Sequence, residues 1–110
     1  MHNHNLNGRW IHRESGSTLD LSQTGDSITG IWTAGKGHGH DSLTGKFTGQ
    51  RCEQGFEGDY VNHEGVVTGK GRMRIGVLRP DEIEFSGYGD WSGGGASGHV
   101  EGSYILHRRH

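Results

Sequence analysis

The sequence predicts an all-β fold, an eight-stranded antiparallel up-and-down (meander) β-barrel, and three observations support this prediction. The 110 residues include 22 glycines, one proline and 28% apolar residues, enough for a thin core between strands but not for a helix bundle. A short unit in which apolar and polar residues alternate recurs along the chain. Brief segments rich in glycine, aspartate and asparagine separate these units, as turns separate strands.

The recurring unit consists of an apolar residue, a polar residue, a glycine, a variable residue and usually an aromatic residue. It occupies residues 28–32, 43–47, 56–60 and 100–104, and variants that end in glycine occupy 67–71 and 85–89. Side chains alternate between the two faces of a strand, so the apolar residue, the glycine and the ring share one face. A glycine on the inner face lets the strand curve and lets a ring lie over bare backbone, as a small barrel requires.

Extension of each unit to its flanking turn signals predicts the strands and their connections. The strands are expected at residues 8–14, 17–23, 27–34, 42–48, 52–61, 66–77, 82–91 and 98–107, in a single domain of residues 1–110 that begins with an N-terminal arm at 1–6. Most turns are so brief that consecutive strands must be antiparallel neighbours, while longer glycine-rich loops are expected at 35–41 and 92–97. Closure pairs the two edge strands, and eight strands enclose a lumen for side chains or one small ligand.

Alternation along each strand predicts a largely apolar inner face and a polar outer face. The expected inner residues are Trp10, His12, Leu19, Leu21, Ile28, Trp32, Leu43, Phe47, Phe56, Tyr60, Val67, Met73, Ile75, Val77, Ile83, Phe85, Trp91, Val100, Tyr104 and Leu106. Three apolar residues, Ile31, Val61 and Ile105, fall on the outer face instead. They are either ordinary exposed residues or a subunit contact in a homo-oligomer.

Composition excludes several classes of partner. The net charge is −2 with acids and bases interspersed, so neither nucleic acid nor an anionic membrane is expected as a partner. No stretch approaches the roughly 18 apolar residues of a membrane span, and the N-terminus has no apolar signal region. Cys52 is the only cysteine, which favours a soluble protein of the reducing cytoplasm. No P-loop, dinucleotide fingerprint or HExxH motif is present, so we expect no cofactor.

The first 48 residues contain an ordered set of segments that resembles a known family. Residues 6–10, 16–18, 27–32 and 43–47 are similar, in order and spacing, to the first four strands of avidin and streptavidin. The Gly-x-Trp of residues 8–10 also resembles the first strand of lipocalins, which share the calycin architecture of an eight-stranded barrel with one closed end. The resemblance implies a ligand at the open end of the lumen.

The resemblance also implies positions for the ligand contacts. The asparagine, serine, tyrosine and second serine that biotin binders place on their first three strands are matched here by His12, Ser17, Trp32 and Ala34. Only Ser17 keeps the residue type. The resemblance therefore implies a small-molecule site at the barrel mouth and leaves the identity of the ligand open.

His12 is the first candidate site residue, because it shares the inner face with Trp10 and lies toward the open end. A histidine there can donate, accept or titrate near neutral pH. Glu14, two residues further on the same face, could orient it, and Tyr60 is a second candidate acid or base. The plainer alternatives are a hydrogen-bonded histidine at the rim and a solvated glutamate at a strand end.

Four inward aromatic residues are the other candidates for ligand contact. Trp32, Tyr60, Trp91 and Tyr104 could stack on a planar ligand, and the phenols would supply polar groups. Filling of the core is the simpler interpretation of the same residues.

The nine histidines raise the question of a metal. His38 and His40 stand two residues apart in a glycine-rich loop, and this spacing makes them weak candidates for chelation. Zinc sites usually draw ligands from more than one element, so we expect no physiological metal. Cys52 is interpreted as an inert inner-face residue at the start of its strand.

Three functions remain open on the sequence alone. The first hypothesis is a binding protein that holds a small, partly apolar ligand at the open end of the lumen, near His12, Ser17, Trp32, Tyr60, Trp91 and Tyr104. The alternative is a small barrel enzyme of the cyclase or isomerase type, which would use His12 with Glu14 or Tyr60 as acid and base. The third is an assembly protein with a filled lumen.

Overall fold

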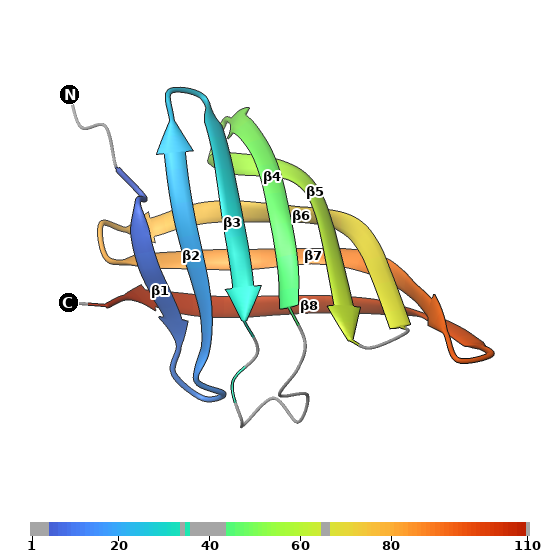
Figure 1. Cartoon of the computed structure of the whole chain (residues 1–110). Coiled ribbons are helices and arrows are strands. Elements are labelled where there is room, and N and C mark those ends of the chain that lie inside the picture. Colours follow the sequence, from blue (N-terminus) through green and yellow to red (C-terminus); the bar gives the residue numbers. More distant parts are fainter. Residues whose placement is uncertain (1–4, 34, 36–43, 65–66, 110) are drawn as a thin grey trace.

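A computed structural model describes residues 5–33, 35, 44–64 and 67–109, and these residues form a closed antiparallel β-barrel. The strands are β1 (Gly8–His12), β2 (Ser17–Thr24), β3 (Ser27–Thr33), β4 (Thr44–Cys52), β5 (Gly55–Glu64), β6 (Val67–Arg79), β7 (Glu82–Gly93) and β8 (Ala96–Arg108). Each strand pairs with the next one along the chain, and β8 pairs with β1 (Figure 1). The predicted fold class, an eight-stranded meander barrel, is confirmed. No helix among the described residues is long and apolar enough to cross a membrane.

Several strand ends differ from the sequence prediction. β1 ends at His12, so Glu14 lies in the turn at residues 13–16 and not on the inner face of the strand. The turn between β4 and β5 is tighter than expected. β4 continues to Cys52, which pairs with Gly55, so the reversal uses Glu53 and Gln54 alone. Cys52 therefore ends β4 and does not begin β5, and it shares its face with Gln50 on the exposed side of the strand. The prediction of an inward Cys52 at the start of its strand is wrong.

The predicted glycine-rich loop at 92–97 is also wrong, since most of it is strand. β7 runs to Gly93 and β8 begins at Ala96, which leaves Gly94 and Gly95 as the turn. Both residues have positive φ, 62° and 84°, the backbone conformation of the tightest hairpin turns. Glycine adopts it without steric cost, and β7 and β8 consequently form one long hairpin. The other predicted loop, at 35–41, lies outside the described residues except for Gly35.

The core confirms most of the predicted inner face. Its fully buried large side chains include Trp10, Phe47, Phe56 and Phe85, and aliphatic residues of β2, β3, β6, β7 and β8 fill the space between them. Leu6, from the predicted N-terminal arm, is also buried in this cluster. The side chains of the predicted inner residues Leu43 and Val67 lie outside the described part. The predicted outward residues Ile31, Val61 and Ile105 are 45%, 38% and 39% exposed.

Glycines on the inner face make room for rings on neighbouring positions. The phenol of Tyr60 occupies the space where a Cβ of Gly45 would stand, and the indole of Trp91 does the same at Gly98. Phe47 lies over Gly49 two residues further along its own strand. A side chain at any of these glycines would displace a ring. The repeat of glycine and ring in the sequence therefore corresponds to the packing of rings over glycines inside the barrel.

The barrel closes through a short seam between its first and last strands. β1 pairs with β8 at Trp10↔Arg108 and Ile11↔His107. The guanidinium of Arg108 lies 4.4 Å from the centre of the Trp10 ring and donates hydrogen bonds to the carbonyl oxygens of Asn5 (2.7 Å) and Asn7 (2.9 Å). Trp10 in turn donates from Nε1 to the carbonyl of Leu6 at 2.9 Å. One arginine thus ties the C-terminal strand to the N-terminal segment.

We expect Arg108→Ala to lower the free energy of unfolding by about 2 kcal/mol, because it removes a cation–π contact and two charge-assisted hydrogen bonds at the seam. Urea denaturation followed by tryptophan fluorescence measures this difference. Arg109→Ala is the matched control, since the side chain of Arg109 is exposed and its backbone bond to Arg9 is retained. Equal losses in the two variants would contradict the role given to Arg108.

Candidate functional site

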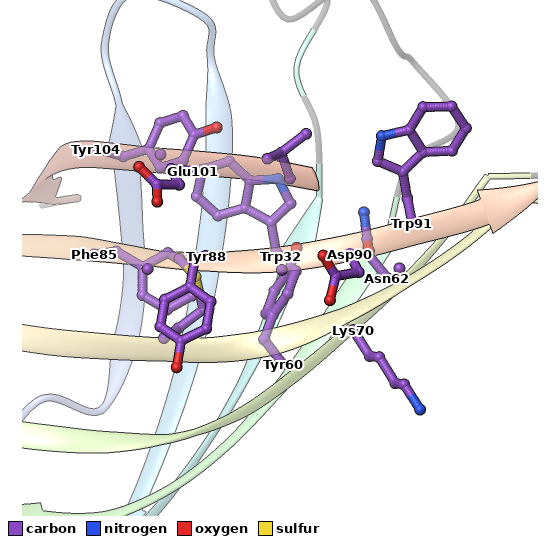
Figure 2. Close-up of a pocket in the computed structure, with 16 residues that line it drawn as sticks. Trp32, Tyr60, Asn62, Lys70, Phe85, Tyr88, Asp90, Trp91, Glu101 and Tyr104 are labelled. Carbon is purple, nitrogen blue, oxygen red and sulfur yellow. The ribbon is translucent and has the colours of Figure 1, made fainter. Parts of the chain in front are cut away.

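The barrel contains a cavity of about 550 Å³ above its packed core. The cavity lies between the ends of β3 and β5 on one side and the long strands β6, β7 and β8 on the other. Figure 2 shows the side chains around it. Its lining consists of aromatic rings and inward glycines together with a few polar side chains.

A cluster of rings separates the cavity from the core. The centre of the Trp32 ring is 5.8 Å from that of Phe85, with the planes nearly parallel at 25°, and 5.1 Å from that of Tyr104. Tyr60 meets Phe85 at 5.9 Å in an edge-on arrangement. Such offset and edge-on contacts are the favourable geometries for aromatic pairs. The rings hold one another in place at the boundary between core and cavity, where Trp32 is 3% exposed and Phe85 is 1% exposed (Figure 2).

Glycines on three neighbouring strands contribute to the wall of the cavity on the side of β6, β7 and β8. Gly69 of β6, Gly87 and Gly89 of β7 and Gly102 of β8 all line the cavity. Gly87 and Gly102 are direct register partners, so neither position contributes a side chain. Side chains from neighbouring positions cover part of this wall: Asn62 Oδ1 lies over Gly69, Met73 Sδ over Gly87 and the ring of Tyr104 over Gly102. The wall is therefore rich in glycine and partly covered by these three side chains.

Uncharged polar groups supply the hydrogen-bonding capacity of the cavity. Burial raises the pKa of the Tyr104 phenol, and burial together with the neighbouring Tyr104 raises the pKa of Tyr60 further. Both phenols are consequently neutral at physiological pH and can donate hydrogen bonds. The amide of Asn62 adds a donor and an acceptor, and its Oδ1 lies over Gly69.

Charged residues at the cavity belong to the outer face of the barrel. Lys70, Asp90 and Glu101 are among the lining residues, but each is adjacent in sequence to an inward glycine or ring and therefore points to the opposite face. Their backbone borders the cavity while their charges lie in solvent. Among the described residues, the side chains that alternate into the cavity carry no formal charge.

The predicted residue His12 belongs to a separate hydrogen-bonded chain next to the cavity. Its Nδ1 lies 2.7 Å from Ser15 Oγ, and Ser15 Oγ donates to Ser17 Oγ at 2.8 Å. Ser17 Oγ also accepts the backbone N–H of Gly35 at 2.9 Å. The chain fixes the turn between β1 and β2 and the segment that follows β3.

The structure brings some predicted site residues together and leaves others apart. Four of the candidates line the same cavity, as a shared ligand site would require: Trp32, Tyr60, Trp91 and Tyr104. The three remaining candidates, His12, Glu14 and Ser17, do not line it.

His12 is nevertheless one ring away from the cavity, since it meets Tyr104 edge-on with centroids 5.3 Å apart. Glu14 is 91% exposed, and its Oε2 lies 3.8 Å from Nε2 of His12. The role of His12 as an acid or base stays a prediction.

The sequence interpretation named only some of the lining residues, and it did not place Asn62 on the inner face at all. Asn62 was assigned to a turn because residues 62–65 have turn-like composition, but β5 continues to Glu64 and Asn62 faces the lumen. The alternation Phe56, Gly58, Tyr60 carried forward by one step would have identified it. The weak metal candidates His38 and His40 lie outside the described residues. Within the described ranges, no group of three or more potential metal ligands comes together.

Comparison of the chain with protein-family models, with curated proteins and with solved structures found no match.

The raised pKa of Tyr60 predicts a pH dependence of stability. The folded state holds the phenolic proton more tightly than the unfolded state, whose phenol has a pKa of 10.0. The contribution is therefore complete below about pH 10 and is lost as pH rises above it. We expect Tyr60→Phe to lose less stability than the wild type between about pH 10 and pH 11, as measured by urea midpoints. Tyr88→Phe, which removes an exposed phenol, should follow the wild type; identical slopes in all three proteins would contradict the assignment.

Proposed function

We propose that the protein binds a small, uncharged, planar molecule in the cavity of the barrel. The observation that carries the proposal is a cavity lined by inward aromatic rings, those of Trp32, Tyr60, Phe85, Trp91 and Tyr104, and by inward glycines of β6, β7 and β8. A cavity of about 550 Å³ falls within the range of small-molecule sites, roughly 300–1,000 Å³. A planar ligand would stack on a partly exposed ring, such as that of Trp91 or Tyr104.

The chemistry of the lining supports a neutral ligand. Transfer of a charged group from water into an apolar cavity is costly unless an opposite charge meets it, and the described inward side chains provide none. The phenols of Tyr60 and Tyr104 and the amide of Asn62 would instead recognise a hydroxyl, carbonyl or ring nitrogen. The ligand we infer is thus an aromatic or conjugated molecule with one or two uncharged polar groups.

The resemblance of residues 6–48 to avidin, and of the first strand to lipocalins, supports a lumenal ligand as well. In this proposal Trp32, at the position of the strand-three tyrosine of biotin binders, is the central stacking residue. His12 and Ser17 would act behind the cavity, by holding the turn between β1 and β2 and supporting the ring of Tyr104. Biotin carries a carboxylate, and it therefore serves as a discriminating probe rather than as the expected ligand.

Two fluorescent probes that differ by one charge test the proposal. N-phenyl-1-naphthylamine is neutral, and 1-anilinonaphthalene-8-sulfonate is the same scaffold with a sulfonate. We expect saturable binding of the neutral probe and binding of the anionic probe weaker by about tenfold or more, because the cavity offers the sulfonate no counter-charge. Biotin should fail to displace the neutral probe. Stronger binding of the anionic probe, or binding of neither, would overturn the proposal.

A substitution that fills the cavity locates the site. Gly102→Val places an aliphatic side chain against Tyr104 inside the cavity, where a Cβ would meet the ring at 3.1 Å. We expect the affinity for N-phenyl-1-naphthylamine to fall about tenfold while the circular dichroism spectrum is unchanged. Gly76→Ala is the matched control, because no atom lies within 4 Å of a Cβ at this outer-face glycine. Unchanged affinity in Gly102→Val would place the probe outside the cavity.

A further inference from the structure

β8 has an edge that the barrel leaves largely uncovered. The strand pairs with β7 along its full length, from Glu82↔His107 to Gly93↔Ala96, but with β1 at Arg108 and His107 alone. From Ser97 to Ser103, no strand among the described residues pairs with the second edge of β8. Figure 1 shows the hairpin of β7 and β8 running past the ends of the other strands. The barrel is therefore closed at one end and continues as a sheet with a free edge at the other.

The direction of the backbone groups along this edge follows from two hydrogen bonds. The N–H of Arg108 donates toward the β7 side, to the carbonyl of Asp81 at 2.9 Å, and the N–H of Arg109 donates toward β1, to the carbonyl of Arg9 at 3.0 Å. Backbone groups alternate in direction along a strand, and the pairing of β7 with β8 has no register shift. The N–H and C=O groups of the odd-numbered residues, among them His99, Glu101 and Ser103, therefore face the free edge.

The sequence of this edge lacks two of the features that normally prevent association. Monomeric proteins protect exposed strand edges with proline, lysine, bulges or a covering segment. The sequence Ser97–Ser103 contains neither proline nor lysine, and its pairing with β7 is regular. Val100 is 56% exposed in the middle of the stretch. Unpaired backbone groups around an exposed apolar side chain are suited to pairing with another strand.

We propose that two copies of this chain associate through this edge, with their β8 strands antiparallel about a two-fold axis at Val100. His99 then stands opposite Glu101 of the partner subunit, and the reciprocal pair repeats the contact on the other side of the axis. Within its own chain, Nδ1 of His99 lies 2.8 Å from Asp90 Oδ1 and Nε2 lies 3.6 Å from Glu101 Oε1, so protonated His99 would join a cluster of carboxylates that the partner's Glu101 extends. Opposite charges directly across an antiparallel pair are stabilising, and like charges are destabilising. An axis at His99 or at Glu101 would place that residue opposite its own copy. The charge pattern thus selects the axis at Val100.

The same register matches the remaining side chains by size. Val100 meets Val100 of the partner subunit, and Gly98 meets Gly102 of the partner subunit on the inner face. Pairs at positions without mutual hydrogen bonds bring their side chains closest together, so the two exposed valines would cover each other at the axis. The result is a continuous sheet from β6 of one copy to β6 of the other, with one apolar contact at its centre.

Sedimentation equilibrium over a range of protein concentrations tests the association. We expect the wild type to reach twice the chain mass of 12.0 kDa and Val100→Lys to remain at the single mass, because two lysines would meet at the axis. Ile31→Lys is the control, since Ile31 is an exposed apolar residue of the outer face on β3 and should leave the dimer intact. A wild type that stays at the single mass, or dissociation by Ile31→Lys alone, would overturn the proposal.

Disulfide trapping tests the register independently of affinity. In a Cys52→Ser background, Val100→Cys places two thiols at the axis, where the Cα atoms of such a pair are about 4.5 Å apart and within reach of a disulfide. Ile105→Cys on the same strand would place its thiols ten residues apart along the ladder, roughly 30 Å. We expect rapid crosslinking of Val100→Cys under mild oxidation and none of Ile105→Cys. Equal crosslinking of the two variants would refute the two-fold axis at Val100.

Discussion

The interior of this barrel depends on rings that lie over glycines. An eight-stranded barrel has room inside for few large side chains, and here each of several rings occupies the place of a neighbouring Cβ: Tyr60 over Gly45, Phe47 over Gly49 and Trp91 over Gly98. The ring supplies the buried apolar area, and the glycine supplies the space and the curvature of the strand. Large core residues are thereby tied to specific small ones on the same or the adjacent strand.

The combination of rings and inward glycines shapes both the packed core and the cavity. Where rings and aliphatic side chains match the glycines, as around Phe56 and Phe85, the lumen is filled. On β6, β7 and β8 beyond Met73 the glycines outnumber the side chains, and Gly71↔Gly89 and Gly87↔Gly102 are cross-strand pairs without any side chain. Such pairs weaken a sheet, because glycine contributes neither packing nor a restricted backbone. At Gly71 and Gly87, however, a Cβ would meet backbone atoms of the neighbouring strand, so these glycines let the strands approach each other closely.

The alternation of apolar and polar residues was sufficient to predict the strand number, the meander order and the inner face, because these depend on a period of two within each strand. The ends of strands were less predictable. Asn62 and the segment 92–97 have the composition of turns. Pairing with neighbouring strands nevertheless keeps Asn62 and most of 92–97 extended, and no local sequence pattern indicates this pairing. His12 and Ser17 were predicted to contact a ligand at the mouth, but neither lines the cavity, and the hydroxyl of Ser15 joins them in a chain beside it. That chain depends on the shape of the turn between β1 and β2, which periodicity does not specify.

The unequal lengths of the first and last strands connect the cavity with the free edge. β1 has five residues and β8 has thirteen, so β1 closes the barrel at one end alone. The unclosed part of β8 forms one side of the cavity mouth, and its second edge has no strand partner among the described residues. Val100 belongs to both, as a lining residue of the cavity and as the centre of the proposed axis. Occupation of the cavity and association of two copies would therefore act on the same segment. A ligand that binds the associated form more tightly than the single chain must strengthen the association of the subunits by the same factor.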